Sequence, residues 1–247
     1  AARPEQLILA IDHAQAQASG AGTHPDLADV VQAPYDTSRM AQVRDILAAW
    51  QAADYDAASG VSHDDNSALP LDQIEAQSAR ATLIFNAWMV RFIWRVLGDE
   101  LALTGRSNTS GEAVVAIMYL MQADPPTLAT YDPATSDSAL FDDIATPDVE
   151  ESRQERIVRA MLDALAWLDA NAGDFEGWRW GHHHTLTLAP LTPLFGLTQV
   201  PALDSTVFPR GFPRHGDMFS VDVANFGIRR PLESDLSIRY GSGPPQR

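Results

Sequence analysis

Hydrophobic side chains recur at three- and four-residue steps through the first two thirds of the chain, a spacing that puts them on one face of a helix. Asp36-Thr37-Ser38 offers an N-cap for the second helix predicted in this way, Ser110 offers one for the fourth, and Gly173 ends the fifth. The third is hydrophobic on several sides, so we expect it to be buried. The five predicted helices cover residues 4–17, 39–56, 71–103, 110–123 and 150–172.

The pattern changes after Gly173, where aromatic residues and threonines begin to alternate with other side chains, as is typical of strands. Two long stretches rich in proline interrupt the regular pattern, and we predict irregular connections there, the first of them a surface loop. The predicted strands cover residues 178–191, 217–226 and 236–240, and the predicted connections cover residues 123–148 and 190–216.

Helices followed by a few strands are typical of the α+β class. We expect one domain in two parts, a mainly helical part at residues 1–173 and a strand-containing part at residues 174–247. Three strands at one end of a helical chain make a poor sheet by themselves, because both of its edges stay open. We therefore expect these strands to pair with polypeptide outside this sequence.

Charge excludes several classes of partner. The 247 residues include 33 acidic and 17 basic ones, which gives a net charge of −16, and every basic residue is Arg. A surface this negative repels phosphate, which disfavours nucleic acid and anionic lipid. The chain has no Cys, so disulfides, thiolate nucleophiles and Cys-ligated zinc are excluded. No apolar run is long enough to span a membrane, and the first residues lack a secretory signal, which predicts a cytoplasmic protein or a processed piece of a longer one.

Three consecutive histidines are the clearest group of metal-ligand type. On a strand, His182 and His184 would share one face and His183 would point to the other. A metal site would then need a third ligand from elsewhere, such as His215 or Asp217. We favour the alternative, in which the histidines are strand residues hydrogen-bonded to their neighbours, and the H-E-x-x-H zinc motif is absent.

The sequence contains no standard motif for calcium, phosphate or serine-hydrolase sites. The acidic pairs Asp64-Asp65 and Asp142-Asp143 have calcium-binding side chains without the spacing of a calcium loop, and we expect solvated loops there. The hydrolase motif G-x-S-x-G and the glycine motifs that bind phosphate are absent. The helix that contains Trp88 and Trp94 is predicted to be core rather than a cofactor site.

Four short motifs occur in a characteristic order along the chain. Residues 178–184 read W-x-W-G-x-x-H, and residues 213–221 read P-x-x-G-D-x-F-S-V. Residues 243–247 read G-P-P-Q-R, and residues 85–101 contain F-x-x-W and, at their end, D-E-L. Their order and spacing resemble the β-chain of the penicillin amidase family, in which the stretch that matches residues 243–247 usually reads G-P-S-x-R, with Ser where Pro245 stands here. The resemblance covers about half of the chain.

The resemblance implies the αββα fold of the N-terminal nucleophile hydrolases. Such an enzyme cuts its own precursor and exposes a Ser at the start of its β-chain. The hydroxyl of this Ser attacks an amide carbonyl, and its α-amino group, with a reference pKa of roughly 7.7–8.0, acts as the base. Backbone and Asn donors stabilise the oxyanion. The implied substrates are N-acyl compounds such as β-lactam antibiotics and acyl-homoserine lactones.

The resemblance transfers no catalytic residue to this chain, because residue 1 is Ala and the family's nucleophile, oxyanion Asn and calcium carboxylates match no position here. We expect an inactive internal or C-terminal part of a β-chain that itself holds no cofactor or metal, and the resemblance implies that any calcium of the parent enzyme is bound by residues outside this segment. Its partners would be the missing α-chain and β-chain segments, and the resemblance alone implies a periplasmic or extracellular location. The alternative is a non-catalytic binding or scaffold protein that keeps part of the fold. The motif positions that we expect to fix turns and strand packing are Trp180, Gly181, His184, Gly216 and Asp217.

Overall fold

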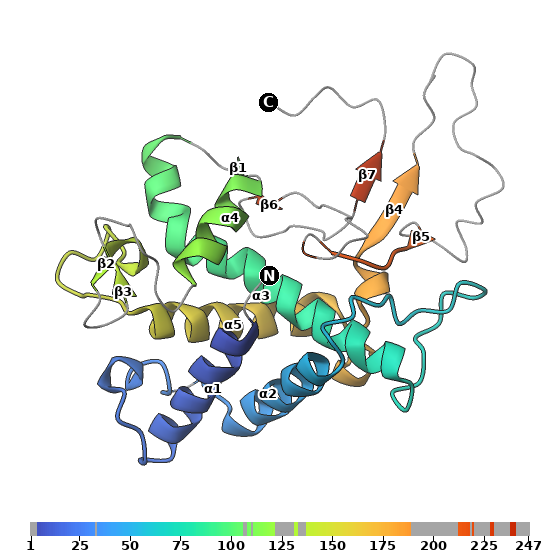
Figure 1. Ribbon diagram of the computed structural model, residues 1–247, viewed down its shortest axis with the longest axis horizontal. Coiled ribbons are helices and arrows are strands. Elements are labelled where there is room, and N and C mark those ends of the chain that lie inside the picture. The colour runs from blue at the N-terminus through green and yellow to red at the C-terminus, as the bar shows by residue number, and fades with distance from the viewer. Residues whose placement is uncertain are drawn as a thin grey trace.

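Five α-helices dominate the part of the chain that the structure describes, and short strands complete it (Figure 1). The structure is a computed structural model, and it describes residues 4–32, 34–105, 108–109, 111–121, 131–132, 137–188, 212–217, 219, 228–229 and 238–240. The helices are α1 (Pro4–Ala18), α2 (Thr37–Ala52), α3 (Ile74–Leu103), α4 (Gly111–Leu120) and α5 (Arg153–Asn171), with 3₁₀ turns η1 (Pro25–Leu27), η2 (Ala139–Phe141), η3 (Phe175–Gly177) and η4 (Trp180–His182).

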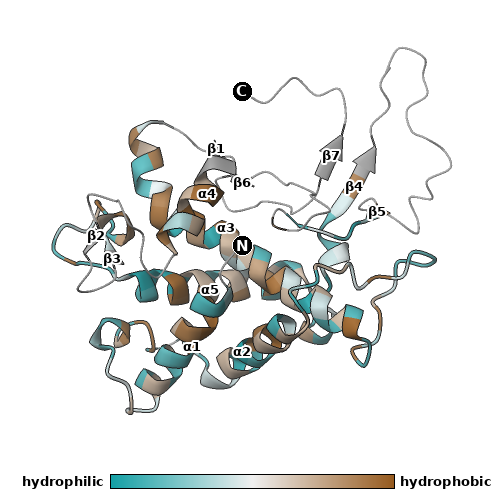
Figure 2. Ribbon diagram, in the orientation of Figure 1, coloured by the Kyte–Doolittle hydropathy of each residue, from teal (hydrophilic) through white to brown (hydrophobic). Residues whose placement is uncertain are grey.

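Helix α3 runs through the middle of the helical part and packs against α2 and α5, while α1 packs against the same two helices (Figure 1). Every residue from 78 to 94 is buried, which confirms the prediction of a helix buried on several sides. Hydrophobic residues of these helices form the core, and the ribbon in Figure 2 is coloured by the hydropathy of each residue. Trp88 stacks on Phe92 with ring centroids 4.9 Å apart, and its indole N–H donates to the Ile157 carbonyl at 3.0 Å. The tryptophans of α3 are therefore core residues.

The ends of the helices follow local signals in the sequence. The Asp36 carboxylate accepts hydrogen bonds from the amides of Ser38 and Arg39 at 2.9 and 3.0 Å, as an N-cap does. Ser152 caps α5 in the same way, through the amide of Glu155 at 3.1 Å. Gly173 follows α5 with φ +70°, a conformation in which glycine is favoured. The cap predicted at Ser110 lies outside the described residues.

Three short strands form the main sheet, in the order β5-β4-β7. The central strand β4 (Thr185–Leu188) is antiparallel to β5 (Phe212–Pro213) and parallel to β7 (Ile238–Tyr240). In this register Leu186 faces Phe212 on one side and Ile238 on the other. Two strand pairs lie apart from this sheet: β1 (Asn108–Thr109) with β6 (Ile228–Arg229), and β2 (Tyr131–Asp132) with β3 (Asp137–Ser138).

The strand predictions have mixed outcomes. The strand predicted at residues 236–240 is confirmed over its last three residues as β7. The strand predicted at residues 178–191 is wrong in its first half, because the amides of His183 and His184 both donate to the Trp180 carbonyl, at 2.9 and 2.8 Å, and close a turn. The strand begins only at Thr185. Of the strand predicted at residues 217–226, residues 217 and 219 are described and are not in a strand, and the rest lies outside the described residues.

The predicted surface loop at residues 123–148 is wrong around Phe141, which is only 1% exposed. The guanidinium Nε of Arg156, on α5, donates to the Phe141 carbonyl at 2.6 Å, and the Phe141 ring stacks on Phe92 with centroids 6.4 Å apart. The acidic, proline-rich sequence around Phe141 predicts a surface position for this side chain. The contact with α5, which comes later in the chain, buries it instead. The predicted connection at residues 190–216 also contains a strand, β5.

The helices and the small sheet are compatible with the α+β class. The predicted division at residue 173 stays a prediction. Trp178 and Trp180, which follow it, belong to the same hydrophobic core as the helices before it.

Candidate functional site

The motif residues meet where η4 packs against α3 and against the loop that precedes this helix. The indole N–H of Trp180 donates to the Gly216 carbonyl at 2.8 Å. The amide of Gly216 in turn donates to the Ala57 carbonyl, and the amide of Gly181 to the Ser59 carbonyl, both at 2.8 Å. The W-x-W-G segment, the G-D segment and loop 57–61 therefore form one hydrogen-bonded junction.

Gly181 lets two backbones approach closely at this junction. A Cβ atom at this position would lie 2.9 Å from the Ser59 Cβ, 3.0 Å from the Ser59 carbonyl oxygen and 3.0 Å from a methyl group of Val61. Real Cβ atoms rarely come so near a backbone atom, so any side chain here would push η4 away from the loop.

His184 is part of the hydrophobic core rather than of a solvent-facing strand. Its side chain is 0% exposed, and its ring stacks on Trp180 with centroids 4.4 Å apart and an interplanar angle of 13°. Its backbone carbonyl accepts the amide of Arg214 at 3.0 Å, which extends the pairing between β4 and β5. The histidine thus connects the indole ring to the sheet.

Asp217 is a buried carboxylate whose two oxygens accept different donors. Oδ1 accepts the amide of Phe219 at 2.8 Å, the local backbone bond expected for an acidic residue after a turn glycine. Oδ2 accepts the side-chain amide of Asn86 at 3.2 Å, and the same amide nitrogen donates to the Thr82 carbonyl at 2.9 Å. Asp217 therefore holds the G-D segment to α3.

Sequence reasoning missed Arg179, the variable position of W-x-W-G. Its guanidinium donates to the carbonyls of Leu69, Glu176 and Trp178, with Nε 3.1 Å from the Leu69 oxygen. Burial lowers the pKa of Arg179, and the positive charge of Arg80 lowers it further. The sequence shows the two tryptophans of the W-x-W motif, but it does not indicate that the residue between them donates hydrogen bonds to three backbone carbonyls.

Ser59 and His215 lie next to each other without the geometry of a nucleophile and its base. The His215 Nδ1 accepts the backbone amide of Ser59 at 3.2 Å, and the Ser59 hydroxyl accepts the amide of Val61 at 3.4 Å. Ser59 is also fully buried. The pair therefore organises the backbone of loop 57–61.

The metal hypothesis for the histidines loses its geometric basis. His182 lies in η4, so it does not share a strand face with His184, and its Nε2 lies 3.2 Å from the Asn66 carbonyl oxygen. His63 and His215 have ring centroids 5.9 Å apart. Within the described ranges, no three His, Asp or Glu side chains are grouped so that they could hold a metal ion.

The acidic pairs lie in loops that they help to close. Asp65 accepts the amide and the hydroxyl of Ser67 at 3.1 and 2.7 Å, and these bonds hold the pKa of Asp65 below its ordinary value. Asp142 accepts the amide of Glu151 at 3.3 Å, and Asp143 accepts the amide of Ala145 at 3.0 Å. Both pairs thus serve local turns.

The described segments that carry the sequence motifs meet in this junction. Comparison with known proteins shows which family the chain matches. The penicillin amidase family model matches residues 6–244. The chain belongs to the penicillin amidase family. No curated protein and no solved structure matches it. In this family member, the described helices include none that is both long enough and apolar enough to cross a membrane.

A second polar cluster in this penicillin amidase relative surrounds the D-E-L segment at the end of α3. Asp99 accepts the amide of Ile144 at 2.9 Å, which holds loop 142–151 against the helix. Burial raises the pKa of Glu100 to about 7, a hydrogen bond with Asp99 adds to the rise, and the positive charge of Arg156 opposes it. The pair therefore holds a proton near neutral pH.

We predict that Glu100 makes stability depend on pH. Because the pKa of Glu100 is about 7 in the folded chain and about 4.5 otherwise, the folded state binds more protons between these values, and stability falls as the pH rises through this window. The variant Glu100→Gln cannot ionise, so its melting temperature should exceed that of the wild type at pH 8 and match it near pH 4. Differential scanning calorimetry measures both.

The exposed residue Glu150 provides the matched control for this prediction. Glu150→Gln removes the same charge, and the melting temperature of this variant should follow the wild type across the pH range. Equal shifts for the two variants would show that overall charge, rather than the Asp99–Glu100 pair, controls the effect.

Proposed function

We propose that this chain is part of a hydrolase of linear amide bonds in N-acyl compounds, such as β-lactam antibiotics or acyl-homoserine lactones. The match to the penicillin amidase family over residues 6–244 carries the proposal. Its geometric support is the junction at which the family-like motifs contact one another, through the bond from Trp180 to Gly216 and the bond from Asn86 to Asp217.

In the proposed reaction, an N-terminal Ser on polypeptide outside these 247 residues is the nucleophile. Its hydroxyl attacks the amide carbonyl while its α-amino group accepts the proton and passes it to the departing amine. Water then hydrolyses the acyl ester and releases the carboxylic acid. The motif residues of this chain support the fold, because the Asp217 carboxylate is committed to two N–H donors and the His184 ring is buried against Trp180.

The proposal assigns the sheet β5-β4-β7 to an αββα sandwich completed by the rest of the enzyme. The strands are two to four residues long, and β4 is parallel to one neighbour and antiparallel to the other. A sheet this small gains stability when further strands pair with its edges. The partners are then the α-chain and the remaining β-chain segments, and the location is periplasmic or extracellular.

We predict that the purified 247-residue chain will not hydrolyse phenylacetyl, phenoxyacetyl or long-chain acyl amides, whereas the protein from the complete reading frame will hydrolyse at least one. The reason is that the nucleophile and the oxyanion donors are assigned to other polypeptide. Amine release detected with a fluorogenic reagent measures both samples on the same panel.

Two results would contradict the proposal. Turnover by the 247-residue chain alone would place the catalytic groups inside it. A complete protein that is folded, but inactive on every amide and lacking a Ser at a processed N-terminus, would favour the non-catalytic binding or scaffold protein instead.

A further inference from the structure

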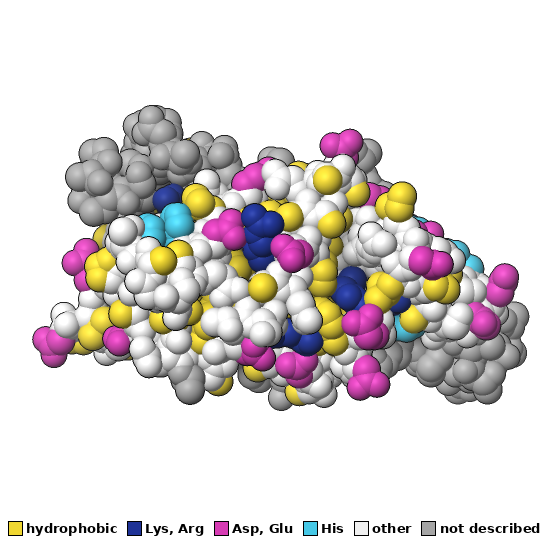
Figure 3. Space-filling model, turned by 90° about the horizontal axis from the view of Figure 1, so that it is seen from below, with side chains coloured by type: hydrophobic (Ala, Val, Ile, Leu, Met, Phe, Trp, Pro, Cys, Tyr) yellow, Lys and Arg dark blue, Asp and Glu magenta, His cyan; other side chains and the backbone are white. Residues whose placement is uncertain are grey.

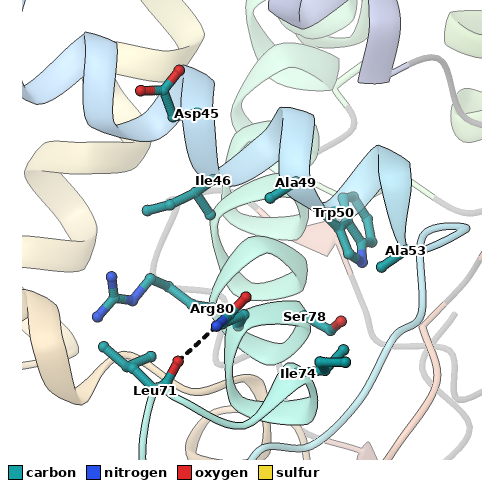
Figure 4. A pocket seen from close by; sticks show the side chains of 10 residues that line it. Asp45, Ile46, Ala49, Trp50, Ala53, Leu71, Ile74, Ser78 and Arg80 are labelled. Carbon is teal, nitrogen blue, oxygen red and sulfur yellow. Dashed lines mark hydrogen bonds between the residues drawn. The ribbon is translucent and has the colours of Figure 1, made fainter.

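A groove of about 350 Å³ lies between α2 and the beginning of α3 (Figure 4). Ile46, Ala49 and Trp50 of α2 form one wall, and Leu71 with Ile74 lies on the opposite side. This volume is at the lower end of the range for small-molecule sites, which run from about 300 to about 1,000 Å³. The groove is therefore large enough for a small ligand with an apolar body.

Most of the groove is lined by apolar side chains, and two of its polar side chains, Trp50 and Gln77, already donate hydrogen bonds. The indole N–H of Trp50 donates to the Asp56 carbonyl at 2.8 Å, so the rest of the ring is available for apolar contact. The side-chain amide of Gln77 donates to the Leu71 carbonyl at 2.8 Å (Figure 4). Ile74 is 71% exposed, which is unusual for an isoleucine beside a groove and leaves apolar surface to be covered.

One end of the groove is cationic. The Arg80 guanidinium extends there between Ile46 and Leu71 (Figure 4), and its side chain is only 9% exposed. Its one ion-pair partner among the described residues is Glu176, at 2.9 Å, whose side chain is 75% exposed. The Nε–H of Arg80 is buried without an acceptor in the described part of the chain. A buried cation with one solvent-exposed partner remains poorly compensated.

Two more arginines, Arg39 and Arg179, lie near this end, and Arg39 is paired with Asp169 at 2.9 Å. Arg39 and Arg80 both lie over the ring of Phe175, at 3.7 and 4.6 Å from its centroid. Arg179 is close enough to Arg80 for the charge of Arg80 to lower the pKa of Arg179, and the described acceptors of Arg179 are carbonyls. The space-filling view shows acidic side chains scattered over one face of the molecule with arginines among them (Figure 3), in a chain of net charge −16.

We infer that this groove binds a small amphipathic carboxylate, whose apolar body lies between Trp50 and Leu71 and whose carboxylate pairs with Arg80. Glu176 is mostly exposed, so it can turn into water when the ligand carboxylate takes its place. Asp45 also lines the groove, but its carboxylate points away from it (Figure 4) and lies 3.4 Å from Arg44. The inference does not depend on whether the chain takes part in amide hydrolysis.

Isothermal titration calorimetry with octanoate tests the inference on the purified chain. Octanoate should bind, and octanamide, which has nearly the same shape without the charge, should bind at least tenfold more weakly. Arg80→Gln should weaken octanoate binding at least tenfold, because a hydrogen bond to a charged group is lost. Arg159→Gln is the matched control, because Arg159 pairs with Glu155 and neither residue lines the groove, and this variant should bind octanoate like the wild type.

A second pair of variants keeps the test decisive if Arg80→Gln does not fold. Ala49 is exposed and lines the groove, whereas Ala41 is exposed on the same helix outside it. Ala49→Trp should fill the groove and abolish octanoate binding, and Ala41→Trp should leave it unchanged. The inference is wrong if octanoate does not bind at millimolar concentration, if octanamide binds equally well, or if Ala49→Trp binds like Ala41→Trp.

Discussion

Gly60→Ala should lower the free energy of unfolding by about 2–5 kcal/mol, the sum of a left-handed backbone penalty of about 1–2 kcal/mol and an overpacking cost of about 1–3 kcal/mol. Gly60 has φ +64°, and a Cβ there would lie 2.4 Å from the Ala79 Cβ and 2.9 Å from the Arg179 Cδ. Ala79 is fully buried in α3, so the new methyl group can be accommodated only if loop 57–61 moves. Urea unfolding followed by far-ultraviolet circular dichroism measures the change.

Gly173→Ala is the matched control for Gly60→Ala. Gly173 has a similar φ of +70°, but no atom lies within 4 Å of the position that a Cβ would take. This variant should therefore show the backbone penalty alone, about 1–2 kcal/mol. If the two variants lose equal stability, the close approach of loop 57–61 to α3 does not contribute, and the junction is looser than its geometry indicates.

Gly60 also shows which features of this fold a sequence can predict. The start of α2 and the end of α5 were predictable because their signals are local: the Asp36 carboxylate reaches amides two and three residues ahead, and Gly173 ends a helix by its own conformation. The predicted end of α2 at residue 56 was wrong, because the helix ends at Ala52 and Asp54 and Tyr55 have positive φ angles. The burial of α3 was predictable because hydrophobic residues cover most of its surface. No residue near Gly60 in the sequence indicates its close approach to Ala79, because this contact joins a loop to a helix that comes later in the chain.

The error at the histidines has a similar physical cause. Alternating aromatic and threonine residues favour a strand by local propensity, yet the carbonyl of Trp180 accepts the amides of His183 and His184 and closes a turn. That turn is fixed from outside, by the bond from Trp180 to Gly216 and by the bond from Gly181 to Ser59. Tertiary contacts of this kind override strand propensity.

The sequence indicated which positions belong to the candidate site, but not which residues contact one another there. The motifs indicated Trp180, Gly181, His184, Gly216 and Asp217, and the structure places all of them in or beside one junction. Asn86 and Arg179 were missed, since the bond of Asn86 to Asp217 spans 131 positions of the chain and Arg179 stands at a variable position of its motif.

Trp180→Ala should lower the free energy of unfolding by about 3–5 kcal/mol, the cost of removing a large, fully buried aromatic side chain. The variant loses the stacking on His184 and leaves the Gly216 carbonyl without the indole donor. Trp180→Phe keeps an aromatic ring beside His184 and loses the indole N–H, so it should lose clearly less. Urea unfolding measures both variants.

Hydrogen exchange distinguishes an anchor of the junction from a general loss of core volume. The amides of Gly181 and Gly216 donate hydrogen bonds to loop 57–61 across the junction. If Trp180 holds the G-D segment in place, Trp180→Ala should therefore speed hydrogen exchange at these two amides more than at helix amides of similar protection. Trp88→Ala is the comparison, since Trp88 is equally buried but donates to Ile157 between two helices. The same exchange pattern in both variants would show that Trp180 fills space and does not anchor the motif.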